Sequence, residues 1–99
     1  MRIVFTDEAL RDLDEILDFI AAHYPTIASP FQQRLRTILQ RIANWRKSAE
    51  EVEQRPDVRV VPLIRYPYKI FYRATTHAVE ILHIHHAARQ PPWNEKDNL

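Results

Sequence analysis

The sequence predicts an α+β fold, with element order β-α-α-β-β-β, in which a two-helix hairpin packs on one face of a small antiparallel sheet. A β-branched run opens the chain, two stretches of helical periodicity follow, and three β-rich segments fill the second half. Because the helices precede most of the strands, they do not alternate with them as in a parallel α/β fold. A chain of 99 residues holds one hydrophobic core. We expect one domain over residues 1–89 and an extended tail over 90–99.

The first helix is predicted to follow the strand at residues 2–5. Thr6 can cap its N-terminus, and Asp7 and Glu8 suit the first turn because the helix macrodipole favours anions there. Apolar residues then recur at spacings of three and four, which places them on one helical stripe until Pro25 ends the helix. They are Leu10, Leu13, Ile16, Leu17, Ile20 and Tyr24.

A second apolar stripe predicts a second helix that starts near Thr26. Pro30 then falls in the first turn, where its missing N–H has no partner within the helix. The stripe consists of Ile27, Phe31, Leu35, Ile38, Leu39, Ile42 and Trp45. Two amphipathic helices with so short a connection form an antiparallel hairpin. Residues 46–57 lack a stripe and are predicted to be a solvated helix end and a loop.

Three β-rich segments follow, and the spacers between them are short enough to imply antiparallel neighbours. The segments are residues 58–64, 68–74 and 79–85. Val79 and Ile81 are expected on one face of the last segment, and Leu82 and Ile84 on the other. Apolar residues on both faces suit a central strand. Pro62 indicates that the first segment is nearer an edge, or bulged.

The composition excludes several classes of protein. Without cysteine there is no disulfide framework, thiolate nucleophile or zinc–thiolate site, and without glycine there is no Gly-rich phosphate loop or nucleophile elbow. No apolar run approaches the roughly 18 residues of a membrane span. The N-terminus lacks a signal-peptide pattern, so we expect a cytoplasmic protein without membrane contact. Turns that need positive φ are expected to use Asn, Asp, His or Pro.

Charge is divided unevenly along the chain, although the net charge is only +1. Residues 1–31 hold two arginines and six carboxylates, a net −4, whereas residues 55–89 hold six cations and two carboxylates, a net +4. One interpretation is a basic sheet surface for an anionic partner, since Lys69 and Arg73 share a face by alternation. The other is a rim of solvated charges, with the tyrosines between them in the core. The candidate target-binding residues are Arg59, Arg65, Lys69, Arg73, His86, Arg89 and Trp93.

Histidines gather near the end of the last predicted strand. His83 and His85 are expected on one face, where they could supply acid–base catalysis or hold a metal ion. Glu80 is the carboxylate nearest in sequence, and alternation puts it on the opposite face. We therefore expect no metal site and no cofactor. For acid–base chemistry, His85 and His86 are the better candidates because they lie at the strand end.

Several segments carry a family resemblance that spans about residues 3–89. They are Thr6-Asp7-Glu8-Ala9-Leu10-Arg11-Asp12-Leu13-Asp14-Glu15-Ile16, the Ala28-x-x-Phe31 helix start, residues 58–73, residues 79–84, and His86-Ala87-Ala88-Arg89. Together they resemble the RelE/ParE superfamily of bacterial type II toxins, the ParE-like branch in particular. The resemblance implies the β-α-α-β-β-β fold that periodicity already predicts. It also implies a toxin that is held inactive by an antitoxin whose disordered segment folds around it.

The two branches of the superfamily differ in their targets. RelE-like members cleave mRNA in the ribosome with Lys, Arg and a C-terminal Tyr or His, whereas ParE-like members are associated with inhibition of DNA gyrase. The ending His86-Ala87-Ala88-Arg89, with no Tyr after it, favours the ParE-like branch. The resemblance thus implies a plasmid-stabilisation type of toxin with gyrase as its target. A ParD-like antitoxin would join it in a hetero-oligomer and make any contact with operator DNA.

Two alternatives stay open. In a ribosome-dependent endoribonuclease, the site would consist of His85, His86, Arg59, Arg65 and Arg73. In an inactivated relative, the chain would bind only its antitoxin. Whichever holds, the acidic first helix and the groove along the two helices are the expected antitoxin site. The candidate residues are Asp12, Leu13, Glu15, Asp18, Phe31 and Leu35.

Overall fold

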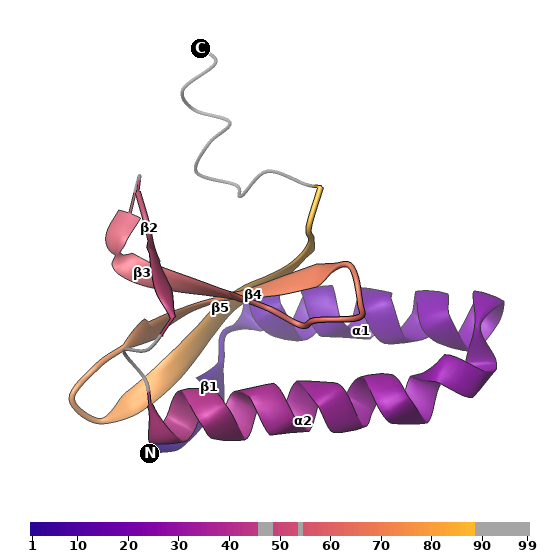
Figure 1. The fold of residues 1–99 in the computed structure, drawn as a ribbon, viewed down its shortest axis with the longest axis horizontal. Helices are drawn as coiled ribbons and strands as arrows, with labels where there is room; N and C mark the ends of the chain where they lie inside the picture. The colour runs from indigo at the N-terminus through magenta and orange to yellow at the C-terminus, as the bar shows by residue number, and fades with distance from the viewer. Residues whose placement is uncertain (46–48, 54, 89–99) are drawn as a thin grey trace, which may run out of the picture.

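The computed structural model describes residues 1–45, 49–53 and 55–88 (Figure 1). Its elements are β1 (Arg2–Phe5), α1 (Asp7–His23), a 3-10 turn (Pro25–Ile27), α2 (Ala28–Asn44), β2 (Glu50–Val52), β3 (Arg55–Pro62), β4 (Tyr68–Ala74) and β5 (Ala78–His86). Arg89 and the predicted tail over 90–99, which holds Trp93, lie outside the described residues. In the part that is described, no helix combines the length and the apolar character needed to cross a bilayer.

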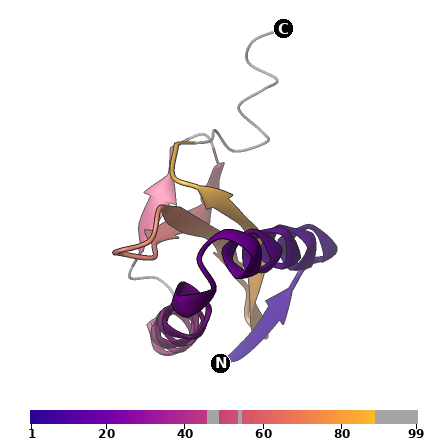
Figure 2. The same cartoon turned by 90° about the vertical axis from the view of Figure 1, so that its right-hand side faces the viewer.

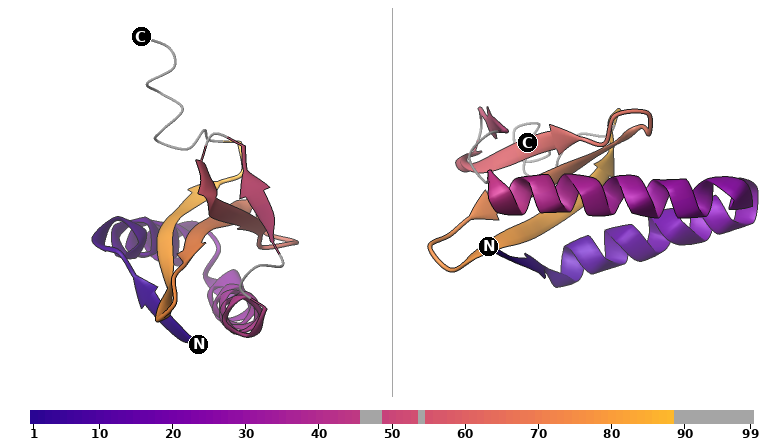
Figure 3. Two further views of the ribbon diagram at one scale, coloured as in Figure 1. Left: turned by 90° about the vertical axis from the view of Figure 1, so that its left-hand side faces the viewer. Right: turned by 60° about the horizontal axis from the view of Figure 1, so that its bottom comes forward.

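The α+β architecture is confirmed. Both helices lie on one side of the sheet and run antiparallel to each other (Figures 2 and 3). The five strands have the order β1-β5-β4-β3-β2. β5 is therefore an interior strand between β1 and β4, as expected for residues 79–85.

The prediction of a wholly antiparallel sheet is wrong for one pair of strands. β1 runs parallel to β5, with Arg2 opposite Ala78 and Phe5 opposite Ile81, while all other pairs are antiparallel. Short spacers fix the directions of β3, β4 and β5 relative to one another. No hairpin joins β1 to its neighbour, so nothing local in the sequence fixes its direction. The sheet is therefore mixed.

Residues 50–52, predicted to be part of a loop, form the additional edge strand β2. Glu50 pairs with Val60 and Glu51 with Arg59. A strand of three residues is too short to show the two-residue period that identifies strands. β2 covers β3 as far as Val60, and Pro62 lies beyond that point, paired only with β4. The proline thus has the edge-like position that its missing N–H requires, although β3 is not an edge strand along its whole length.

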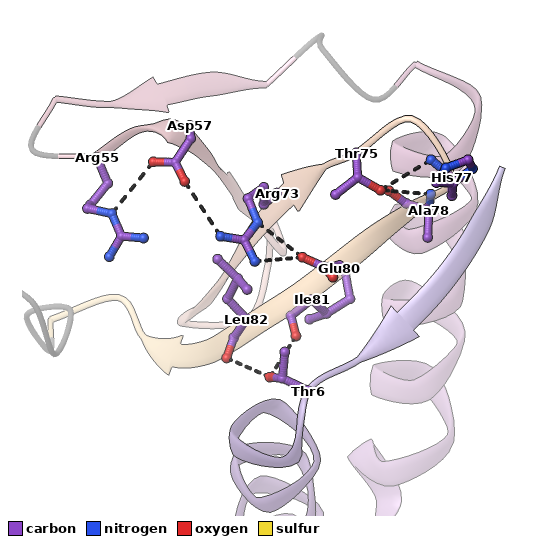
Figure 4. Close-up of polar contacts among 10 residues, drawn as sticks. All are labelled: Thr6, Arg55, Asp57, Arg73, Thr75, His77, Ala78, Glu80, Ile81 and Leu82. Atoms are coloured by element: carbon purple, nitrogen blue, oxygen red, sulfur yellow. Dashed lines mark hydrogen bonds and ion pairs between the residues drawn. The ribbon is translucent and has the colours of Figure 1, made fainter.

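The N-terminus of α1 is joined to strand β5 through Thr6. Its Oγ1 accepts a hydrogen bond from the Ala9 N–H (3.2 Å), which makes Thr6 the N-cap that the sequence predicts. The same hydroxyl faces the carbonyl oxygens of Ile81 (2.9 Å) and Leu82 (3.1 Å), to which it can donate (Figure 4). Thr6 therefore fixes both the start of the helix and its position on β5.

We expect Thr6→Ala to lower the free energy of unfolding by about 1–2 kcal/mol, because it removes the helix cap and a donor to β5. Thr6→Ser, which keeps the hydroxyl, should cost less than half as much. Equilibrium urea unfolding of the two variants beside the parent chain measures the difference. Equal losses would show that the hydroxyl contributes nothing and that only the methyl group matters.

The second helix begins later than expected. Pro25–Ile27 form a 3-10 turn and α2 starts at Ala28, so the expectation of a start near Thr26 is wrong by two residues.

Some residues of the two predicted apolar stripes are exposed. Leu10, Tyr24 and Trp45 are 48%, 55% and 63% exposed, so these three members of the predicted stripes lie outside the core.

The main hydrophobic core fills the space between the helix hairpin and the sheet. It is made of Ala9, Ile16, Ile20, Phe31, Leu35, Ile38, Ile42, Leu63, Ile70, Tyr72, Val79, Ile81 and Ile84. A smaller cluster of Val52, Val58 and Phe71 covers part of the opposite sheet face. That second face is therefore only partly free for a partner.

A β-bulge in β5 changes which face its last residues occupy. Phe71 of β4 pairs with His83, but Tyr72 pairs with Ile81, so Leu82 is an extra residue in the ladder. Beyond the bulge, Ile84 faces the helices with Ile81, whereas Leu82 joins the smaller cluster. The expectation that Leu82 and Ile84 share a face is wrong, because simple alternation does not hold across a bulge.

In the β3–β4 connection, the two positions with positive φ are not occupied by any of the residue types expected there. Ile64 and Arg65 have φ values of 36° and 81°. Left-handed backbone is costly for a residue with a Cβ, and most of all for a β-branched one. The connection is closed by the Leu63 N–H, which donates to the Tyr68 carbonyl oxygen (3.0 Å). The hairpin thus holds two exposed side chains, Ile64 and Arg65, in a strained turn.

Candidate functional site

Arg73, a nuclease and target-binding candidate, is held by carboxylates. Its Nε and Nη2 donate to Glu80 Oε1 (3.0 and 2.7 Å), and its Nη1 lies 3.7 Å from Asp57 Oδ2 (Figure 4). The hydrogen bonding of Arg73 to Glu80, together with both acidic charges, raises the pKa of Arg73 above its already high ordinary value, against a smaller opposing effect of burial. Asp57 also pairs with Arg55 (3.6 Å). Arg73 therefore belongs to a row of ion pairs across β3, β4 and β5.

The strand register separates Arg73 from the histidines at the end of β5. Arg73 lies opposite Glu80, whereas His86 lies opposite Tyr68. Five residues of β4 separate these two positions, and at about 3.3 Å each they put roughly 17 Å between them. Arg73 and His86 lie at opposite ends of the sheet and cannot act on one phosphate.

Arg59, another nuclease candidate, holds the backbone that enters β2. Its Nη1 donates to the carbonyl oxygen of Ala49 (2.7 Å). Its neighbour across the β3–β4 ladder is Tyr72, which is fully buried. Burial raises the pKa of Tyr72, while the charge of Arg59 and a backbone hydrogen bond from Ala49 act in the opposite direction. Tyr72 is thus a core residue, and Arg59 makes a structural contact beside it.

Three of the target-binding candidates lie at the same end of the sheet, where β5 finishes. The register puts Lys69 and His86 on opposite faces there, because they belong to adjacent positions of the β4–β5 ladder. The Ala87 N–H donates to the Pro67 carbonyl oxygen (2.7 Å), which joins the end of β5 to the connection that carries Arg65. Lys69 is paired with His85, and its Nζ lies 5.5 Å from the centre of the Phe71 ring. His86 is exposed there. We call this end of the sheet, with Ile64, Arg65, Lys69 and His86, the turn surface.

The two remaining histidines of β5 lie in a different cluster, with a carboxylate from α1. His83 Nδ1 is 3.5 Å and His85 Nε2 is 3.7 Å from Asp12 Oδ2. The rings of His83 and His85 are 5.0 Å apart, which confirms that they share a face. Glu80 is the carboxylate nearest in sequence, but the expectation that no other carboxylate lies near the histidines is wrong, because α1 runs along β5 and brings Asp12 to them. No local signal connects Asp12 with the histidines, so sequence reasoning missed this cluster.

The antitoxin-binding candidates divide into surface and core residues. Glu15 and Asp18 are exposed on α1, whereas the Asp12 side chain is 18% exposed and turned to β5. Leu13 and Leu35 line a groove of about 290 Å³. The other lining residues are Phe5, Leu17, Gln32, Arg36 and Leu39. Phe31 is fully buried and offers no surface.

Comparison with known proteins decides the family. The sequence profile described as ParE toxin of type II toxin-antitoxin system, parDE, matches residues 3–91. The chain belongs to this family. No curated protein matches it in sequence. Among solved structures, this ParE-family chain is similar to one from the chromosomal ParDE toxin–antitoxin system of P. aeruginosa. The TM-score is 0.73 at 25% identity, over 87% of this chain and 95% of that one.

The fold is also shared with the isolated E. coli RelE toxin. The TM-score is 0.58 at 17% identity, and the alignment covers 98% of this chain and 95% of the other. At this identity the likeness concerns the fold alone. In the described part of the ParE-family chain, the five residues proposed for an RNA-cleaving site do not gather at one point. Arg59 and Arg73 serve structural contacts, and His85 lies beside Asp12.

Proposed function

We propose that this ParE-family toxin acts by binding DNA gyrase in the cytoplasm and is neutralised by a ParD-like antitoxin. The observation that carries the proposal is the family match over residues 3–91. The distribution of the cationic side chains supports it, because it is unlike that of an RNA-cleaving site.

Cleavage of RNA by attack of a 2′-hydroxyl needs a base, an acid and cations around one phosphate. Of the residues proposed for that role, Arg73 is bound by two carboxylates and lies about 17 Å from His86 along the ladder. Arg59 is bound to a backbone carbonyl. The arrangement favours a toxin that acts by binding over one that acts by catalysis.

The turn surface is the proposed contact with the target. Ile64 is 54% exposed, Arg65 next to it in the turn is exposed, and His86 is exposed at the same end of the sheet. An exposed apolar side chain beside an arginine is typical of the residues that dominate protein interfaces. The backbone strain at Ile64 and Arg65 has no role in the core, and strain of this kind gathers at functional sites.

The groove between the helices is the proposed antitoxin site. Its walls are largely leucine side chains, and Glu15 and Asp18 are exposed on α1. A segment that folds as it binds, with apolar residues for the groove and basic residues for the carboxylates, is complementary to this surface.

Purified toxin should inhibit the supercoiling of relaxed plasmid by DNA gyrase, and added antitoxin should restore it. Arg65→Glu should raise the toxin concentration needed for half-inhibition about tenfold, since it reverses a charge in the proposed contact. Arg11→Glu is the matched control, because Arg11 is an exposed arginine on α1, and it should leave inhibition unchanged. Intact gyrase activity together with mRNA cleavage in a translation extract would instead support the endoribonuclease.

A further inference from the structure

Three side chains with metal-binding atoms meet where α1 passes the edge of β5. The Oδ2 atom of Asp12, the Nδ1 atom of His83 and the Nε2 atom of His85 all lie within 4.8 Å of one another. The two histidine nitrogens are 3.5 and 3.7 Å from the carboxylate oxygen. Tetrahedral coordination at bond lengths of about 2.0–2.1 Å separates ligand atoms by roughly 3.3 Å. Small side-chain rotations therefore bring these atoms to coordination distance.

The backbone holds the three residues in this arrangement. β1 ends at Phe5, so the edge of β5 beyond Ile81 has no strand beside it, and α1 lies there instead. The Ile84 N–H donates to Asp12 Oδ2 (3.0 Å), which fixes the carboxylate between the two histidines. His83 and His85 both lie beyond the bulge at Leu82, two positions apart, and therefore point to the same side of β5. An orienting hydrogen bond of this kind is common behind metal ligands.

We propose that Asp12, His83 and His85 form a binding site for a divalent transition metal ion, with Zn²⁺ as the best match. Two imidazoles and one carboxylate are a donor set for zinc, whereas Ca²⁺ and Mg²⁺ prefer oxygen ligands throughout. The side chain of His85 is 2% exposed, but those of Asp12 and His83 are 18% and 19% exposed. The site is thus open to solvent on one side, which leaves a further coordination position for water or a partner's side chain.

The bound ion would connect α1 directly to β5. Thr6 and Asp12 also hold α1 against β5, each through a hydrogen bond with the backbone of that strand. Because an ion that binds only the folded chain stabilises it, zinc should raise the thermal stability of the toxin. None of the three proposed ligand residues belongs to the turn surface or lines the helical groove, so the inference does not depend on the proposed function.

The test uses the full chain with no histidine tag, freed of metal by chelation. Zn²⁺ should bind with one ion per chain in isothermal titration calorimetry and should raise Tm. Asp12→Asn, which keeps an acceptor for the Ile84 N–H, and His83→Gln should each weaken binding at least about tenfold. His86→Gln and His77→Gln remove exposed histidines elsewhere on the same strand and its preceding turn, and they should bind Zn²⁺ as the parent does.

Circular dichroism of each metal-free variant shows whether it is folded, so that lost binding is not confused with lost structure. Co²⁺ used in place of Zn²⁺ should give visible absorption bands of a low-symmetry site with nitrogen ligands, and these bands should be absent from His83→Gln. The inference is overturned if the parent chain shows no saturable binding. It is equally overturned if Asp12→Asn and His83→Gln bind Zn²⁺ as tightly as the parent.

Discussion

Replacing Phe31 with alanine is expected to lower the free energy of unfolding by about 3–5 kcal/mol. The side chain is fully buried and packs edge-on against two tyrosine rings, with ring centres 5.4 Å from Tyr66 and 5.8 Å from Tyr68. Its loss leaves a cavity where α2 meets the β3–β4 hairpin. A domain of this size has a total stability of only about 5–15 kcal/mol, so the variant would be close to unfolded at growth temperature. Equilibrium urea unfolding followed by circular dichroism measures the loss.

Phe19→Ala is the matched control. Phe19 is 48% exposed on α1, where it stacks on His23 with ring centres 4.3 Å apart. Its truncation should cost about 1 kcal/mol or less. Similar losses for the two phenylalanines would contradict the placement of the core between the hairpin and the sheet.

The second large effect concerns antitoxin binding. Leu39→Lys should weaken the affinity for the antitoxin by about 10- to 100-fold, because it puts a cation into an apolar groove that is proposed to receive apolar and basic residues. Leu39 is half-buried, so a lysine there can keep its chain along the helix and its ammonium group in water. Calorimetric titration of the toxin variant with the antitoxin gives the affinity, and its melting curve shows whether it is folded.

Leu10→Lys makes the same chemical change outside the groove. Leu10 is 48% exposed on α1 and does not line the groove, so the affinity should stay within about twofold of the parent. If Leu10→Lys weakens binding as much as Leu39→Lys does, the groove is not the antitoxin site.

The features that could be predicted from the sequence are those set by local chemistry. The bounds of α1 follow from the Thr6 cap and from Pro25, and both act within one turn of the helix end. The interior position of β5 in the sheet follows from apolar residues on both of its faces. The parallel pairing of β1 and the pairing of β2 depend on contacts between distant segments, and no local pattern in the sequence encodes them.

For the candidate sites too, the local patterns could be predicted from the sequence, and the contacts between distant segments could not. That His83 and His85 share a face follows from alternation between adjacent positions. Asp12 joins them only because α1 runs along β5, and Ile84 changes face only because Leu82 is bulged. The alternation of basic residues in β3 and β4 allows a basic sheet surface, but Glu80 and Asp57 bind Arg73 through the register of three strands. Such carboxylate partners can be identified only once the pairing of the strands is known.

The most direct test of the central claim is to produce the toxin in bacteria without its antitoxin and to pulse-label DNA and protein synthesis in the same culture. A gyrase-binding toxin predicts that DNA synthesis falls first, with induction of the DNA-damage response, while protein synthesis continues. An early fall in protein synthesis with undiminished DNA synthesis would contradict the account and support RNA cleavage. If neither falls, the chain is an inactive relative that only binds its antitoxin, and the account is equally contradicted.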